Sequence, residues 1–327
     1  MAPRPRKTRL APANDETIAA AAACLRAGGL VAMPTETVYG LAADATSDRA
    51  VVEIYAAKGR PAFNPLIAHV LDLGSAREHG MFVQEAERLA RAFWPGPLTL
   101  VVPVAPTCRV GLLARAGLDT VAFRSPSNPT ARALIAEAGV PLAAPSANRS
   151  GRVSPTTADH VLTDLEGRID WILDGGPSRL GLESTIIACA GKPPTLLRPG
   201  ALTQEVIEAE LGSRLDVSNP VGAAPNAPGQ LASHYAPRAE LRLGAQDAKP
   251  DEAALDFAGA LSSTASRGHL DLSPSGDLIE AAANLFSYLR ALDESGAPRI
   301  AVAPIPEGGL GAAINDRLRR AAAPRSM

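Results

Sequence analysis

Residues 15–41 read DETIAAAAACLRAGGLVAMPTETVYGL, and this stretch decides the fold class. Its first part is rich in alanine, starts at Asp15, a good helix N-cap residue, and stops at the Gly28-Gly29 pair, so it predicts a helix. The apolar run 30–33 follows and is halted by Pro34, which predicts a short, mostly buried strand. A helix, a buried strand and then a polar segment are typical of α/β proteins.

The same alternation continues to about residue 210. Apolar side chains at i, i+3, i+4 and i+7 predict a helix from Ala86 to Phe93, and Asn128-Pro129 begins another that runs through Ala138. Between the helices, short apolar runs predict buried strands at residues 66–70, 98–104, 120–123, 142–144 and 171–173. The pattern favours an α/β fold whose open twisted sheet is flanked by helices.

Composition divides the chain into four regions. Residues 1–14 are basic and lack an apolar segment, so we expect a disordered tail. Residues 15–212 form the main domain, and residues 213–238, crowded with proline and glycine, predict an interdomain linker. Residues 239–327 predict a smaller, Rossmann-like α/β domain. Its expected elements are the stretches 241–243, 278–292, 300–303 and 312–323.

The charge balance excludes several classes of function. The chain has 32 Lys plus Arg against 34 Asp plus Glu, so no bulk attraction to nucleic acid or to an anionic membrane is expected. Its three cysteines form no disulfide framework, which favours a reducing cytoplasm. No apolar run is long enough to span a membrane. There is no P-loop or GxSxG motif, and the five histidines show no metal-ligand spacing, so no protein metal site is predicted.

Three polar segments carry the chemistry. The first is PTETVYGL, residues 34–41, which follows a predicted strand where open α/β sheets bind ligands. Taken alone, it is better explained as an ordinary polar turn closed by Gly40. The last of the three along the chain is APSANRSG, residues 144–151. Its small hydroxyl and amide groups can surround a phosphate or an adenine. They can also form an ordinary turn before a helix near Thr157.

The second segment is KGRPAFNPL, residues 58–66. Lys58 lies seven residues after Val51 and four after Ile54, so on a continued helix it projects from the apolar face and needs an anionic partner. A lysine that complements the helix dipole ahead of a glycine cap is the ordinary alternative. Arg60, held in a segment stiffened by two prolines, favours a preorganised pair of cations suited to polyphosphate.

Taken together and in order, these segments point to one protein family, although no single segment does. The ordered set PTETVYGL, KGRPAFNPL, PGPLTLV, PSANRSG, DGGPSRLGLESTII and LRPG resembles the YrdC-like threonylcarbamoyl-AMP synthases over about residues 15–210. The linker that ends in His234-Tyr235-Ala236-Pro237 and the smaller tail domain look like the long, two-domain form of that family.

The resemblance implies a nucleotidyltransferase that converts L-threonine, bicarbonate or CO2, and ATP into L-threonylcarbamoyladenylate and pyrophosphate. The residues that it implies for catalysis are Lys58, Arg60, Ser146 and Asn148. Those implied for ATP are Arg60, Asn64, Thr120, Ser146, Ser154, Arg198, His234 and Tyr235. Those implied for L-threonine are Thr37, His69, Arg124, Ala144 and Ser184.

It also implies Mg²⁺ carried in on ATP and downstream proteins that pass the threonylcarbamoyl group to tRNA. The reaction would then be the first step of tRNA threonylcarbamoyladenosine modification. Two alternatives stay open. One is an RNA-binding module of the same fold without this activity, in which the arginines make a weak RNA contact. The other is a carbamoyl-transfer domain like that of hydrogenase maturation factors, although the chain has no cysteine cluster.

Overall fold

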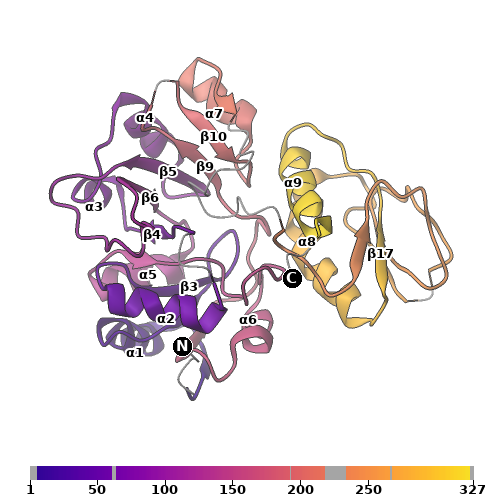
Figure 1. The fold of residues 1–327 in the computed structure, drawn as a ribbon, viewed down its shortest axis with the longest axis horizontal. Coiled ribbons are helices and arrows are strands. Elements are labelled where there is room, and N and C mark those ends of the chain that lie inside the picture. Colours follow the sequence, from indigo (N-terminus) through magenta and orange to yellow (C-terminus); the bar gives the residue numbers. More distant parts are fainter. Residues whose placement is uncertain (1–5, 61–63, 192, 218–232, 266, 325–327) are drawn as a thin grey trace.

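A computed structural model describes residues 6–60, 64–191, 193–217, 233–265 and 267–324. Residues 61–63 of the KGRPAFNPL segment and residues 218–232 of the predicted linker lie outside this described part. The described chain forms a larger and a smaller α/β domain (Figure 1), so the predicted fold class is confirmed.

The larger domain is built on an eleven-stranded mixed sheet in the order β1-β8-β2-β3-β7-β4-β6-β5-β9-β10-β11. The strands are β1 (Arg9–Pro12), β2 (Val31–Met33), β3 (Gly40–Asp44), β4 (Ile67–His69), β5 (Leu98–Pro103), β6 (Thr120–Arg124), β7 (Leu142–Ala143), β8 (Trp171–Asp174), β9 (Thr185–Ala188), β10 (Thr195–Arg198) and β11 (Asp216–Val217). The helices are α1 (Asp15–Arg26), α2 (Asp48–Lys58), α3 (Leu73–Arg77), α4 (Gln84–Phe93), α5 (Pro129–Ala138), α6 (Ala158–Leu165) and α7 (Gln204–Leu211).

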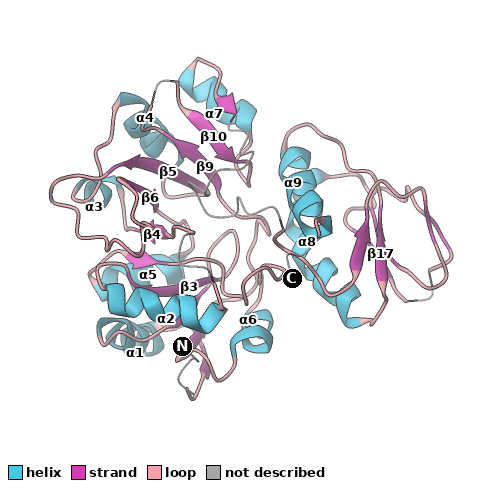
Figure 2. Cartoon of the chain, in the orientation of Figure 1, coloured by secondary structure: helices cyan, strands magenta, loops and turns pink. Residues whose placement is uncertain are grey.

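Alternating side chains place helices on both faces of this sheet. On β2, Ala32 belongs to the apolar cluster that contains residues of α2, α4 and α6. Its neighbours Val31 and Met33 point the other way, into the cluster with α1 and α5. Apolar side chains are therefore buried on both faces of the sheet. Figure 2 shows the strands and helices of this domain in separate colours.

The prediction of a disordered tail is wrong for Arg9–Pro12. These residues form the edge strand β1, which pairs in parallel with β8, Arg9 lying opposite Trp171. The Arg6 side chain forms ion pairs with Glu53 and Asp170, and the Arg9 guanidinium lies 5.3 Å from the centre of the Trp171 ring. The basic residues have partners far away in the sequence, which composition cannot reveal.

Strand β3 changes the setting of the PTETVYGL segment. It pairs antiparallel with β2, Met33 lying opposite Gly40, so residues 34–39 are the connection between two neighbouring strands. Strand β11 pairs in parallel with β10. This pairing places Asp216–Val217 in the large sheet, although they fall inside the predicted linker.

The smaller domain has a four-stranded parallel sheet in the order β12-β17-β14-β16. Its strands are β12 (Glu240–Arg242), β14 (Ala253–Asp256), β16 (His269–Asp271) and β17 (Arg299–Val302); β13 (Asp247–Ala248) pairs separately with β15 (Ser262–Ser263), and the helices are α8 (Leu278–Glu294) and α9 (Leu310–Ala322). Elements expected at 241–243, 278–292, 300–303 and 312–323 correspond to β12, α8, β17 and α9. No helix of the described chain is long and apolar enough to cross a membrane.

Helices α8 and α9 lie on the side of the smaller domain that faces the larger one (Figure 1). Val38, Val153 and Leu182 of the larger domain share an apolar cluster with buried residues of the smaller domain. A Cβ on Gly181 would come within 2.5 Å of the Ala282 carbonyl oxygen on α8, so the two backbones approach closely there. The domains are therefore in direct, packed contact.

Candidate active site

A pocket opens where loops from both halves of the large sheet meet the chain that enters the smaller domain. It encloses about 560 Å³ of empty space, its open mouth included. Its lining residues are Thr35, Thr37, Val38, Gly40, Arg60, Ile67, His69, Arg124, Ala144, Pro145, Ser146, Glu183, Ser184, Arg198, His234 and Tyr235. Ten predicted site residues are in that set: Thr37, Arg60, His69, Arg124, Ala144, Ser146, Ser184, Arg198, His234 and Tyr235.

Three buried arginines give the pocket its charge. Arg60, Arg124 and Arg198 are each exposed by 8% or less. The Arg198 Nη2 donates to the Ser184 carbonyl at 2.8 Å and to the Ser184 hydroxyl at 3.2 Å. Burial lowers the pKa of Arg60 to about 10, and the nearby charge of Arg198 adds to the effect. Three buried cations around one pocket suit an anionic ligand, because a buried charge without a partner costs free energy.

Lys58 projects into the interior, as the sequence predicted, and is 3% exposed. Within the described chain, its ammonium donates to the carbonyl oxygens of Ser146 and Asn148, each at 2.5 Å. The anionic partner expected from the sequence, a polyphosphate, stays a prediction. Burial, followed by the charge of Arg60, lowers the pKa of Lys58 well below the usual value. Lys58 thus ties the end of α2 to the APSANRSG loop.

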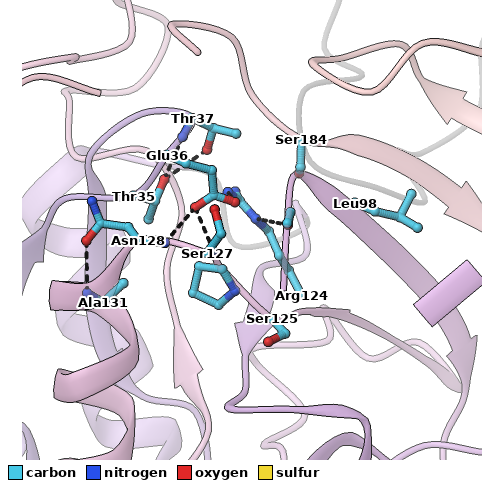
Figure 3. A network of polar contacts seen from close by, with 12 residues as sticks. Thr35, Glu36, Thr37, Leu98, Arg124, Ser125, Ser127, Asn128, Ala131 and Ser184 are labelled. Atoms are coloured by element: carbon cyan, nitrogen blue, oxygen red, sulfur yellow. Dashed lines mark hydrogen bonds and ion pairs between the residues drawn. The ribbon is translucent and has the colours of Figure 1, made fainter. Parts of the chain in front are cut away.

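Glu36 and Arg124 form a buried ion pair at one side of the pocket (Figure 3). The Arg124 Nη2 lies 2.6 Å from Glu36 Oε1, and Glu36 Oε2 accepts from the backbone N–H groups of Ser127 at 3.1 Å and Asn128 at 3.4 Å. Burial alone would raise the pKa of Glu36, but the Arg124 charge and hydrogen bonds lower it overall. The carboxylate therefore fixes Arg124 from β6 next to Thr35 and Thr37.

The imidazole of His69 is a neutral group in this pocket. It stands at the end of β4 and is 3% exposed, and burial, with the Arg124 charge second, lowers its pKa to about 3. Opposite, the Ser184 hydroxyl lies 2.7 Å from that of Thr99. Both groups can offer hydrogen bonds without adding charge.

Besides Lys58, four predicted residues lie outside the lining. Asn64 is fully buried, and neither polar atom of its side chain has a hydrogen-bond partner within the described chain. Asn148 Nδ2 donates to the Arg149 and Arg152 carbonyls at 2.8 Å and so shapes the loop.

Ser154 donates to Glu183 Oε1 at 2.6 Å and thus contacts a residue of the lining. Thr120 begins β6, four residues before Arg124, and pairs with Pro103. The structure does not bring Thr120 together with the other predicted residues.

Sequence reasoning missed six lining residues: Thr35, Val38, Gly40, Ile67, Pro145 and Glu183. Glu183 is the most informative, because it is a carboxylate, 6% exposed, among arginines. Its signal was an acidic residue between Leu182 and a run of buried β-branched residues. Among the residues that the structure describes, no three His, Cys, Asp or Glu side chains are grouped to hold a metal ion.

Fold and pocket define a class of two-domain α/β proteins with an arginine-lined pocket beside a mixed sheet. The family model described as "Telomere recombination" matches residues 23–200, and the model described as "Threonylcarbamoyl-AMP synthase, C-terminal domain" matches residues 202–323. The chain therefore belongs to the threonylcarbamoyl-AMP synthase family.

Individual relatives agree along nearly the whole length. The threonylcarbamoyl-AMP synthase of Bacillus subtilis is 42% identical over 337 residues, covering 95% of this chain and 94% of that protein. That of Schizosaccharomyces pombe is 37% identical and covers 89% of this chain and 84% of that protein. The crystal structure of P. abyssi Sua5 complexed with L-threonine gives a TM-score of 0.85 at 38% identity and covers 97% of each chain.

Proposed function

We propose that this chain joins L-threonine, bicarbonate or CO2, and ATP into L-threonylcarbamoyladenylate and releases pyrophosphate. The observation that carries the proposal is the convergence of Arg60, Arg124 and Arg198 on one pocket, with Lys58 bracing the adjacent loop. Full-length similarity to threonylcarbamoyl-AMP synthases supports it, and the L-threonine in the P. abyssi relative indicates the amino acid.

The reaction must bring anions together. The threonine amine and bicarbonate or CO2 form a carbamate, whose carboxylate oxygen attacks the α-phosphorus of ATP while the bond to the β-phosphate oxygen breaks. Each step places like charges side by side, so buried cations that are fixed before the substrates arrive lower the barrier. No covalent nucleophile of the protein is needed.

In this proposal Arg124, held by Glu36, faces the threonine carboxylate, and the neutral side chains of Thr37, His69 and Ser184 surround the amino acid. Arg60 and Arg198 take the phosphates. Residues 144–148 form the wall between the two substrates, with Lys58 fixing its backbone. Asn64 offers its unpartnered amide to the nucleotide, which would give both polar atoms hydrogen bonds.

The carboxylates of Glu183 in the lining and of Glu36 behind it do not suit a protein-held metal ion, because Glu183 pairs with Arg317 and Glu36 with Arg124. Mg²⁺ carried by the phosphates of ATP stays part of the proposal. So do a cytoplasmic location and downstream proteins that transfer the threonylcarbamoyl group to tRNA. The alternatives of an RNA-binding module and a carbamoyl-transfer domain are not favoured by the full-length matches.

The test is pyrophosphate release from ATP and bicarbonate, with and without L-threonine, in the native protein and in Lys58→Ala. We expect release that depends on threonine in the native protein. The variant should lose on the order of a hundredfold in rate, because the loop that Lys58 braces would no longer be preorganised. Lys249→Ala, an exposed lysine of the smaller domain, is the matched control and should keep the native rate.

Equal release without threonine would reject the proposed substrate. Release driven by carbamoyl phosphate in place of threonine and bicarbonate would favour the carbamoyl-transfer alternative. A native rate in Lys58→Ala would show that the loop needs no lysine.

A further inference from the structure

Arg317 is a charged side chain buried completely at the domain boundary. It lies on α9 of the smaller domain, is 0% exposed, and is the largest fully buried side chain of the described chain. Its Nε donates to Glu183 Oε2 at 2.9 Å, and its Nη1 donates to Asp316 at 2.6 Å. A guanidinium is buried this deeply only where its charge is matched.

Glu183 connects this arginine to the pocket. It lines the cavity together with Arg60 and Arg198, and its second oxygen accepts from Ser154 at 2.6 Å. Without a cation of its own, this carboxylate would repel an anionic ligand. It would also compete with that ligand for the Arg198 guanidinium. Burial would raise the pKa of Glu183, but the charges of Arg317 and Arg198 lower it, so the group stays ionised.

Arg317 also supports a second part of the lining. Its guanidinium carbon lies 5.2 Å from the centre of the Tyr235 ring, whose other contact with the smaller domain is a stack on Phe286 at 5.5 Å. Tyr235 is 1% exposed and has a left-handed backbone with φ of 63°. Its ring packs edge-to-face on His234 at 4.1 Å, so both residues are held from the smaller domain.

We infer that Arg317 is a positioning residue for the nucleotide: it neutralises Glu183, so that this carboxylate does not repel the phosphates, and it holds Tyr235. The smaller domain thereby supplies part of the electrostatics of a site whose lining belongs mainly to the larger domain. The inference rests on the proposed function only for the identity of the anion as ATP.

A double-mutant cycle tests this role. Arg317→Met keeps an unbranched side chain, shorter than that of arginine, and removes the charge. Glu183→Gln removes the opposing charge. For each single variant and for the double variant, KM and kcat of threonine-dependent pyrophosphate release are measured together with equilibrium binding of ATP.

We expect Arg317→Met to raise KM and the dissociation constant for ATP by about tenfold or more in the native background, with kcat changed less than about threefold. In the Glu183→Gln background the same substitution should cost less than about threefold, because the charge that it leaves uncompensated is gone. Arg317→Lys should give a smaller loss than Arg317→Met. Arg319→Met, an exposed arginine of the same helix, should stay within about threefold of the native protein.

Equal costs of Arg317→Met in both backgrounds would overturn the inference, and so would an unchanged ATP affinity. If Arg317→Met does not fold, Arg317→Lys and the double variant decide, because both avoid an unpaired carboxylate. A native protein that binds ATP without threonine-dependent turnover would refute the proposed reaction, while its ATP affinities would still test Arg317.

Discussion

Glu36 shows how one side chain can serve the site and the fold together. Its two oxygens hold Arg124 and the backbone at the start of α5, and both members of the ion pair are about 95% buried, with side-chain exposures of 4% and 5%. Removing one member of a buried pair leaves the other charged group without compensation, and that penalty exceeds what the intact pair contributes. Exposed pairs behave differently, because water screens them.

Glu36→Ala should therefore lower the free energy of unfolding by about 3–5 kcal/mol. Glu137→Ala, which removes the half-exposed partner of Arg26, should change it by less than about 1 kcal/mol. Urea denaturation followed by circular dichroism measures both. Similar losses in the two variants would mean that the buried pair is not held in the way described.

Single positions also mark how far the sequence could predict the site. The apolar spacing before Lys58 predicted its burial, because helical periodicity is a local property. It could not predict that the partners are the carbonyls of Ser146 and Asn148, since that contact joins residues about 90 apart in the chain. The role of Glu183 depends on Arg317 in another domain, and no local pattern could reveal it.

Among the secondary-structure elements, those with clear start or stop residues were predicted well. Gly28-Gly29 ends the first helical segment, Asn128-Pro129 begins α5, and the apolar runs became β2, β4, β5, β6, β7 and β8. Strand β3 was missed because GLAAD is short and poor in β-branched residues, and its pairing with β2 and β7 supplies the stability that its composition lacks. Pairing also explains β1.

The loop before β9 and helix α8 fit together through one glycine. Gly181 has φ of 66°, and an added Cβ would lie 2.5–2.6 Å from the backbone of Ala282 and Ala283. Gly212, after α7, has φ of 68° with nothing within 4 Å. Both glycines have a left-handed backbone, but only Gly181 lies against another element.

Gly181→Ala should lower the free energy of unfolding by about 1–3 kcal/mol more than Gly212→Ala, because overpacking adds to the common cost of a left-handed alanine. Chemical denaturation of both variants gives the difference. Limited proteolysis should cut Gly181→Ala faster between the domains. Matching losses would show that loop and helix can separate freely.

Taken as a whole, the protein joins its two domains through buried and partly buried polar groups as well as apolar ones. Arg290 of α8 pairs with Asp164 of α6 at 2.7 Å, Thr156 and Ser287 place their hydroxyls 2.8 Å apart, and Arg317 pairs with Glu183. The family resemblance predicted two domains, but the sequence could not show which charges cross between them. Because Glu183 is both a pocket residue and an interdomain contact, protonation should affect domain attachment and ligand binding together.

Stability should reflect this through pH. The pKa of Glu183 in the folded protein lies below its usual value of 4.5, so its stabilising contribution is complete above about pH 4.5 and is lost as the pH falls through the folded pKa. Glu183→Gln lacks the charge at every pH, so it removes one of the two carboxylates that pair with Arg317. The native protein should therefore be more stable than this variant at pH 7, and the gap should shrink as the pH falls below about 4.5. Urea midpoints of both proteins at pH 7 and pH 3.5 measure the gap, and a stability difference that is the same at both pH values would show that the ion pair of Glu183 and Arg317 does not stabilise the domain boundary.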